Sequence, residues 1–226
     1  MTGRIETIRG PDDFAAAFDV SRETLDRLRR YAELLERWQK VQNLVSPRTL
    51  PEVWQRHFAD SAQLLEHAPP FRLWLDLGSG AGFPGLVIAI LAANRQDAVV
   101  HLVESNGRKC AFLAEVARCT EAAVEIHNLR IESLSAANKV MAPDIVSARA
   151  LASLDDVLDL AQPLFGRDTV GLLLKGRQAA EELEAARKRW TFDARLIPSR
   201  TQAGAHIVEL RDPRPAEKPR MDPNNE

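Results

Sequence analysis

The sequence predicts an α/β protein with a Rossmann-like, mostly parallel seven-stranded sheet, helices on both faces and an N-terminal helical cap. Three observations support this fold class. An apolar segment at residues 73–77 runs into a glycine-rich turn and then a helix-like stretch. From residue 71 onward, short β-type runs alternate with helix-type runs, which is typical of parallel sheets. Residues 1–70 carry no strand pattern and are expected to be helical.

The cap is expected to contain three helices. The first covers residues 11–18, Ser21 caps the second, and Pro51 opens the third. In the second helix, apolar residues recur at intervals of three and four, which indicates one buried face: Leu25, Leu28, Ala32, Leu35 and Trp38.

The alternating part predicts six clear strands and a weaker seventh. The clear strands are expected at residues 73–77, 99–103, 124–127, 145–147, 170–174 and 206–209, and the weaker one at 190–198. Helices are expected at 84–93, 108–120, 154–160 and 178–189. We therefore divide the chain into a cap (1–70), an α/β domain (71–211) and a tail (212–226). The tail is expected to be disordered, because prolines and charges dominate it.

Composition limits the possible functions. A net charge of −2 excludes a uniformly basic protein, although a local basic face can still bind RNA. The two cysteines, Cys110 and Cys119, fit neither a zinc motif nor a redox pair, and we find no cluster of metal ligands. No apolar run approaches the roughly 20 residues of a membrane span, and no signal peptide is visible. We expect a cytoplasmic monomer that needs no metal and does not bind membranes.

The glycine-rich turn is the strongest candidate for a ligand site. Glycines at 78, 80, 82 and 85 permit a tight turn and a close approach of ligand to backbone. The following helix presents free N–H groups and the positive end of its dipole. Asp76 lies at the carboxyl end of the strand, where open α/β sheets bind ligands. Residues 80–85 match the dinucleotide fingerprint, which by itself is weak evidence.

The next strand ends in Glu104, 26 residues after Gly78 (104 − 78). An acid about 20 residues beyond the turn typically binds the ribose hydroxyls of a nucleotide. This fits adenosine in either a dinucleotide or S-adenosylmethionine. An acid just before the turn, here Asp76, is typical of the S-adenosylmethionine enzymes. The alternative is a purely structural turn with a solvated Glu104.

With these residues in place, the chain resembles the small-subunit ribosomal RNA guanine-N7 methyltransferases, also called the glucose-inhibited division protein B family. The resemblance covers roughly residues 20–210. It rests on the turn at 76–85, with its Phe-Pro-Gly ending, and on several shorter motifs: Asn43-Leu44, Arg56-His57, Asp60-Ser61, residues 104–109, Ser147-Ala-Arg149-Ala and Leu174-Lys175-Gly176. The acid after the second strand is commonly Asp in that family, whereas it is Glu104 here.

The resemblance implies a class I methyltransferase fold with S-adenosylmethionine as methyl donor. It implies methylation of guanine N7 at position 527, in the 530 loop of bacterial 16S rRNA in the small ribosomal subunit. In the matching positions, Gly78 and Phe83 contact the donor, Glu104 binds its ribose, and Ile131 and Glu132 flank its adenine. Arg149 matches a further cofactor-site arginine of the family, and we add the turn residues Asp76, Gly80 and Gly82 to this predicted cofactor site.

No catalytic acid–base pair is certain in the sequence. N7 of guanine carries a free lone pair at neutral pH, so methyl transfer needs positioning more than a base. We consider Arg149, Asn43 and His57 as candidates for that positioning. Arg149 could instead pair with a surface carboxylate, and Asn43 could merely cap the preceding helix.

The predicted RNA contacts are basic or polar residues of the cap and of the sheet edge: Arg29, Arg30, Arg56, His57, Arg108, Lys109 and Lys175. The alternative is an ordinary charged surface balanced by neighbouring glutamates. If Arg29 and Arg30 bind phosphate, reversing both charges weakens RNA binding and leaves donor affinity unchanged.

Three other functions remain possible from the sequence. An NAD(P)-dependent oxidoreductase would use the same glycine turn, although no acid for hydride chemistry stands out. A non-catalytic ribosome-assembly factor would retain the pocket without using it. A small-molecule methyltransferase would leave the basic cap unexplained.

Overall fold

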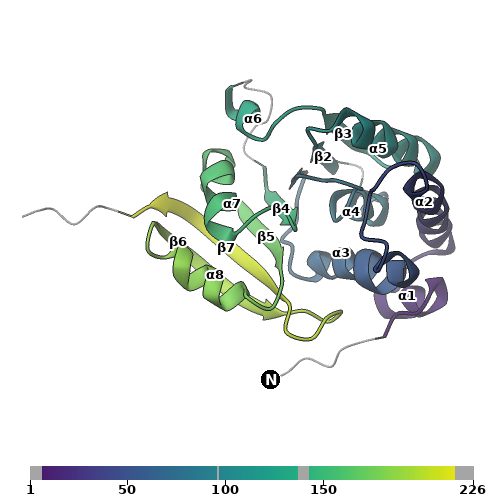
Figure 1. The fold of residues 1–226 in the computed structure, drawn as a ribbon, viewed down its shortest axis with the longest axis horizontal. Coiled ribbons are helices and arrows are strands. Elements are labelled where there is room, and N and C mark those ends of the chain that lie inside the picture. Colours follow the sequence, from purple (N-terminus) through teal and green to yellow (C-terminus); the bar gives the residue numbers. More distant parts are fainter. Residues whose placement is uncertain (1–6, 96, 137–142, 217–226) are drawn as a thin grey trace, which may run out of the picture.

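The computed structural model describes residues 7–95, 97–136 and 143–216 and places seven strands in one sheet (Figure 1). The strand order is β3-β2-β1-β4-β5-β7-β6. The bounds are Leu73–Leu77 (β1), Val99–Val103 (β2), Val124–His127 (β3), Ile145–Arg149 (β4), Val170–Lys175 (β5), Trp190–Pro198 (β6) and His206–Pro215 (β7). β7 pairs antiparallel with both β5 and β6, and the four other pairings are parallel, so the predicted mostly parallel sheet is confirmed.

The helices begin and end close to their expected positions. They are Pro11–Phe18 (α1), Arg22–Gln39 (α2), Asp60–Ala62 (α3), Gly85–Leu91 (α4), Gly107–Thr120 (α5), Glu132–Ala136 (α6), Leu154–Ala161 (α7) and Ala179–Ala186 (α8). Ser21 caps α2 as predicted, because its side-chain oxygen accepts a hydrogen bond from the Thr24 N–H at 3.1 Å. The short α6 was not predicted.

The third cap helix is irregular. It starts with a 3-10 turn at Leu50–Glu52, continues as a π-helical turn at Trp54–Ala59, passes through α3, and ends with a 3-10 turn at Gln63–Glu66. π-Helical turns occur mostly as local distortions and often lie at functional sites. This one carries Arg56 and His57.

The sheet has two apolar faces with different coverings. Alternate residues such as Trp74 and Leu102 pack on the face covered by α4, α5 and the cap. Their neighbours, such as Leu75 and Val103, pack on the face covered by α7 and α8. Cap side chains share the first core with the sheet, so the cap and the α/β domain are packed as one unit.

The predicted start of the tail is wrong by several residues. β7 continues to Pro215, since Thr191 and Trp190 of β6 pair with Arg214 and Pro215 beyond a register irregularity. Prolines and charges are tolerated there because the strand has left β5 and pairs on one side. Residues 217–226 lie outside the described part of the chain. Within that part, the structure contains no helix that is long and apolar enough to cross a membrane.

The order of the strands places the site. The chain moves outward from β1 through β2 to β3 and then returns to β4 on the other side of β1. In open α/β sheets, ligands bind outside the carboxyl ends of the strands at such a reversal. The glycine turn, Glu104 and Arg149 all lie at these strand ends.

Candidate functional site

Asp76 is hydrogen-bonded to the glycine turn from the carboxyl end of β1. Its carboxylate accepts hydrogen bonds from the Ser147 hydroxyl at 2.7 Å and from the Gly85 N–H at 3.2 Å. Burial raises the pKa of Asp76 to about 6, although these hydrogen bonds act in the opposite direction. The side chain is fully buried. The structure thus gives Asp76 protein partners, whereas the sequence placed it among the groups that touch a cofactor.

The glycines of the turn have different roles. A Cβ at Gly82 would lie 2.5 Å from Leu86 Cδ1 and 2.6 Å from the Tyr31 hydroxyl, and its φ is +91°. Gly82 is therefore required for packing against the cap rather than for ligand contact. A Cβ at Gly80, where φ is +58°, would meet nothing closer than 3.7 Å. The space beside Gly80 is open to a ligand.

Two cavities meet at this turn. The larger, of about 500 Å³, lies between the sheet edge and the cap; we call it the cap cavity. The smaller, of about 330 Å³, lies over the ends of β2 and β3; we call it the Glu104 cavity. Both are lined by Gly78, Gly80, Lys109 and Ala150. The turn therefore forms the boundary between two adjoining binding spaces.

The Glu104 cavity brings together three of the predicted cofactor residues, Glu104, Ile131 and Glu132. The two carboxylate oxygens of Glu104 accept hydrogen bonds from the N–H of Gly80 at 2.9 Å and of Asn106 at 2.8 Å. A carboxylate offers about four lone-pair positions, so two remain for hydroxyl donors. The Glu104 side chain is one methylene longer than the Asp that is common in the resembled family. It reaches the glycine turn directly and fixes the position of the turn.

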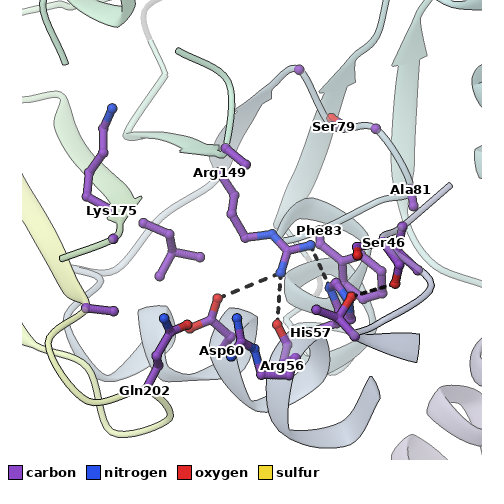
Figure 2. A pocket seen from close by; sticks show the side chains of 18 of the residues that line it. Ser46, Arg56, His57, Asp60, Ser79, Ala81, Phe83, Arg149, Lys175 and Gln202 are labelled. Atoms are coloured by element: carbon purple, nitrogen blue, oxygen red, sulfur yellow. Dashed lines mark hydrogen bonds and ion pairs between the residues drawn. The ribbon is translucent and has the colours of Figure 1, made fainter. Parts of the chain in front are cut away.

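Arg149 lines the cap cavity and contacts both the cap and the glycine turn (Figure 2). Its guanidinium donates hydrogen bonds to the Arg56 carbonyl at 3.1 Å and to His57 Nδ1 at 2.8 Å. It also lies 5.0 Å from the centre of the Phe83 ring. Phe83 in turn stacks on Tyr31, with ring centres 5.2 Å apart. Arg149 thus joins the end of β4 to the cap and to the glycine turn.

His57 is neutral in this arrangement. Burial, and then the positive charge of Arg149, lower the pKa of His57 to about 3. Because a guanidinium only donates, Nδ1 of His57 is the acceptor and Nε2 carries the proton. Nε2 lies 2.9 Å from the Thr49 hydroxyl, which itself donates to the Ser46 carbonyl at 2.9 Å. This directed chain fixes Arg149 and gives His57 a positioning function.

Asp60 completes the cluster, although the sequence analysis assigned it no function. Its carboxylate lies 3.7 Å from the Arg149 guanidinium and accepts a hydrogen bond from the Thr201 hydroxyl at 2.8 Å. Burial raises the pKa of Asp60, and Arg149 acts in the opposite direction. Asp60 therefore connects the cap, the end of β4 and the loop before β7. Tyr31 was also missed, and its hydroxyl donates to the Ala81 carbonyl in the turn.

The predicted RNA contacts are only partly brought together. Arg56, His57 and Lys109 line the cap cavity, and Arg108 precedes Lys109 at the exposed start of α5. Lys175 also lines that cavity, but its ammonium bonds to the Ala152 carbonyl and Glu182, and its side chain is 9% exposed. Figure 2 shows this side chain pointing away from Arg149. Its charge is thus neutralised inside the protein.

Arg29 and Arg30 do not line either cavity, and an RNA contact by these two residues stays a prediction. Arg29 pairs with Asp12 and Asp26, and Arg30 bonds to the Cys119 carbonyl near the end of α5. Lys109 lies at the opposite end of α5, about 15 Å away along the helix axis. The direction of α2 against α5, which the sequence does not specify, causes this separation.

Asn43 follows α2 in an exposed loop, next to cavity-lining residues. Its side-chain oxygen accepts a hydrogen bond from Gln39 at 3.3 Å. This contact joins two side chains and does not cap the last turn of α2, and it leaves the side-chain amide nitrogen of Asn43 for other partners. A base contact by Asn43 stays a prediction.

Comparison with known proteins shows the family of this chain. The family model described as rRNA small subunit methyltransferase G (GidB) matches residues 24–208. The chain belongs to this family. "Ribosomal RNA small subunit methyltransferase G" of Parvibaculum lavamentivorans is 52% identical over 201 residues, covering 88% of each chain. The protein of that name from Methylorubrum populi is 55% identical over 192 residues, covering 85% of this chain and 90% of its own.

A solved structure confirms the fold independently of close sequence similarity. A putative O-methyltransferase from Klebsiella pneumoniae has a TM-score of 0.55 at 13% identity, covering 88% of this chain and 94% of its own. The Rossmann-like methyltransferase architecture is therefore confirmed. Membership in the GidB family favours an rRNA methyltransferase over the oxidoreductase and the non-catalytic assembly factor.

Proposed function

We propose that this chain transfers the methyl group of S-adenosylmethionine to N7 of a guanine in 16S rRNA of the small ribosomal subunit, at position 527 in the 530 loop. The observation that carries the proposal is the junction of two cavities at Gly78 and Gly80 in a member of the GidB family. One cavity suits the nucleoside part of the donor, and the other suits the target base. The reaction then takes place where they meet.

The residues of the Glu104 cavity fit the donor. Gly80 leaves room for a ligand against the backbone, since a Cβ there would meet nothing within 3.7 Å. Glu104 keeps acceptor capacity for two ribose hydroxyls beyond its bonds to Gly80 and Asn106. Ile131 supplies an apolar surface for the adenine. When bound, S-adenosylmethionine supplies an electrophilic methyl group on a sulfonium.

The cap cavity fits an extruded guanine. Its wall combines Phe83 with the guanidinium of Arg149, and Arg56 and Lys109 add positive charge at its edge. A guanidinium has five N–H donors; the bonds to Arg56 and His57 use two of them, and the Asp60 carboxylate faces a third. The others can bind guanine O6 or a neighbouring phosphate. N7 lies in the deep groove of A-form RNA, so the target base must be unstacked or in a loop.

The chain's catalytic contribution is positioning and electrostatics. The N7 lone pair attacks the methyl group directly, which explains why the cavities need no acid–base pair. Holding two reactants in line can lower the barrier by on the order of 7–11 kcal/mol. The neutral His57 and buried Asp60 keep the Arg149 guanidinium in one orientation for this purpose.

Calorimetric titration with S-adenosylmethionine, and with NAD in parallel, tests the donor assignment. We expect binding of S-adenosylmethionine only, at least tenfold weaker in Gly80→Val and Glu104→Ala. Glu104→Asp is the matched control: it keeps the charge but is one methylene shorter, so its loss is expected to be smaller. Binding of NAD alone, or donor affinity equal in all variants, would contradict the assignment.

The acceptor assignment needs a second experiment. Radiolabelled donor is incubated with naked 16S rRNA and with small subunits purified from cells that lack the enzyme, and N7-methylguanine is mapped by cleavage at the modified base. We expect one modified guanine, in the 530 loop. Methylation at another position or on another atom would retain the donor site and overturn the proposed target.

A further inference from the structure

Two histidines and a glutamate lie together at the β3 edge of the sheet, outside both cavities. His101 of β2 pairs in register with Glu125 of β3, and His127 follows two residues later. Side chains two residues apart on a strand leave the same face, so all three side chains project together. The side chains of His101 and His127 are 11% and 6% exposed, whereas that of Glu125 is 61% exposed. The cluster is therefore enclosed by protein and reached from solvent through the carboxylate.

The distances in this cluster are those of metal ligands. His127 Nε2 lies 3.1 Å from His101 Nδ1 and 3.7 Å from Glu125 Oε1. One ligand atom from each residue lies within 4.8 Å of the other two. Ligands about 2.0–2.2 Å from a tetrahedral Zn²⁺ are about 3.3–3.6 Å from one another. Small side-chain rotations would place all three around one ion.

We propose that His101, Glu125 and His127 form a binding site for a Zn²⁺-type dication, with water as the fourth ligand. Two imidazoles and one carboxylate form a set that suits zinc and its transition-metal neighbours, whereas Mg²⁺ and Ca²⁺ prefer oxygen ligands. The ligands stand on paired strands, so the backbone already holds them in position.

Metal binding replaces the hydrogen bond between the two histidine rings. In the metal-free protein one of the two facing nitrogens, His101 Nδ1 or His127 Nε2, donates its proton to the other. When the ion binds, that ring moves the proton to its other nitrogen, so both facing nitrogens present lone pairs to the ion. In the metal-free arrangement His101 Nε2 lies 3.4 Å from Glu125 Oε2, and this contact is given up when the carboxylate turns to the ion. No change in the total number of bound protons is required.

The site would stabilise structure rather than carry out methyl transfer. It joins the edge strand β3 to β2 just before both strands end. The His127 carbonyl accepts the Glu104 N–H at 3.1 Å, so the ion would stiffen the strand ends that carry Glu104. The sequence analysis missed the cluster because Glu125 and His127 lie 24 and 26 positions after His101 (125 − 101 and 127 − 101). The three residues meet only through strand pairing.

Titration of the metal-free full chain with Zn²⁺, followed by calorimetry, tests the proposal. We expect one equivalent to bind, at least tenfold more weakly in Glu125→Gln and in His101→Gln. Glu125 is mostly exposed, so Glu125→Gln is expected to fold even if the buried histidine variant does not. His67→Gln and Cys119→Ser serve as controls, because they remove a histidine and a thiol outside the cluster.

Two further measurements make the outcome specific. Zn²⁺ is expected to raise the unfolding temperature of the wild type and of both controls, but not of Glu125→Gln. Co²⁺ in place of Zn²⁺ is expected to give tetrahedral visible bands without a thiolate charge-transfer band. The proposal is overturned if the wild type takes up no zinc, or if zinc binding depends on Cys119 or His67 instead of Glu125. Neither measurement uses methyl transfer, so the result is independent of the proposed function.

Discussion

The Glu104 cavity and the cap cavity adjoin each other but are built in different ways. The Glu104 cavity is formed mainly by the ends of consecutive strands and the short segments that follow them, between Gly78 and Glu132. The cap cavity also takes residues from the cap, from the end of β4 and from the loop before β7. The first is defined by local chain geometry, and the second by long-range hydrogen bonds around Arg149 and Asp60. Changes at each should therefore have different effects.

The glycine turn should give the largest effect on stability. Gly82→Ala places a Cβ at 2.5–2.6 Å from Leu86 and Tyr31 at a φ of +91°. Overpacking and backbone strain together should cost about 3 kcal/mol or more of unfolding free energy. Gly80→Ala is the matched control: it also has positive φ but meets open space, so about 1 kcal/mol is expected. Urea unfolding measures both. Equal losses would mean that the turn does not pack on the cap as described.

The Arg149 cluster should give the next largest effect, and it should separate the two cavities. Arg149→Gln removes the donors to Arg56 and His57 and leaves Asp60 buried without its cation. Breaking such a pair should cost about 3 kcal/mol of stability, and methyl transfer should fall at least a hundredfold. If the cluster acts only on the cap cavity, the affinity for S-adenosylmethionine should change little.

A double variant tests whether the unpaired Asp60 carboxylate causes the loss of stability in Arg149→Gln. In Arg149→Gln/Asp60→Asn the unpaired carboxylate is gone, so part of the lost stability should return while methyl transfer stays low. Arg149→Lys keeps the charge without the planar fork and should not restore activity. A loss of donor affinity as large as the loss of activity would instead place Arg149 in the donor site, as the family resemblance implies.

The contrast between the cavities also explains what the sequence could predict. Apolar runs and the glycine turn defined every strand, including the weaker one at 190–198, because buried strands and positive-φ turns leave local patterns. The same patterns placed Glu104, Ile131 and Glu132 beside one cavity. Asp60 and Tyr31 leave no such pattern, since their partners lie 141 and 50 residues away. The position of Arg29 depended on the direction of one helix against another, which periodicity does not encode.

Surface charge should give the smallest effect, and it tests whether the basic cap or the start of α5 binds RNA. Arg108→Glu/Lys109→Glu reverses two charges in the first turn of α5, where Lys109 lines both cavities. Arg29→Glu/Arg30→Glu reverses two charges about 15 Å away along α5, more than the Debye length of about 10 Å at 0.1 M salt. The first pair should weaken rRNA binding and lower the salt slope by about 0.7–0.9 for each phosphate that the protein no longer neutralises. The second pair should leave rRNA affinity and its salt slope nearly unchanged.

Filter binding over a salt series measures the difference between the two double variants, with donor affinity measured separately because Lys109 lines both cavities. An equal loss in the two variants would extend the RNA surface along α2 to the cap arginines, and the cap would then bind RNA well beyond the cavity that Arg149 organises.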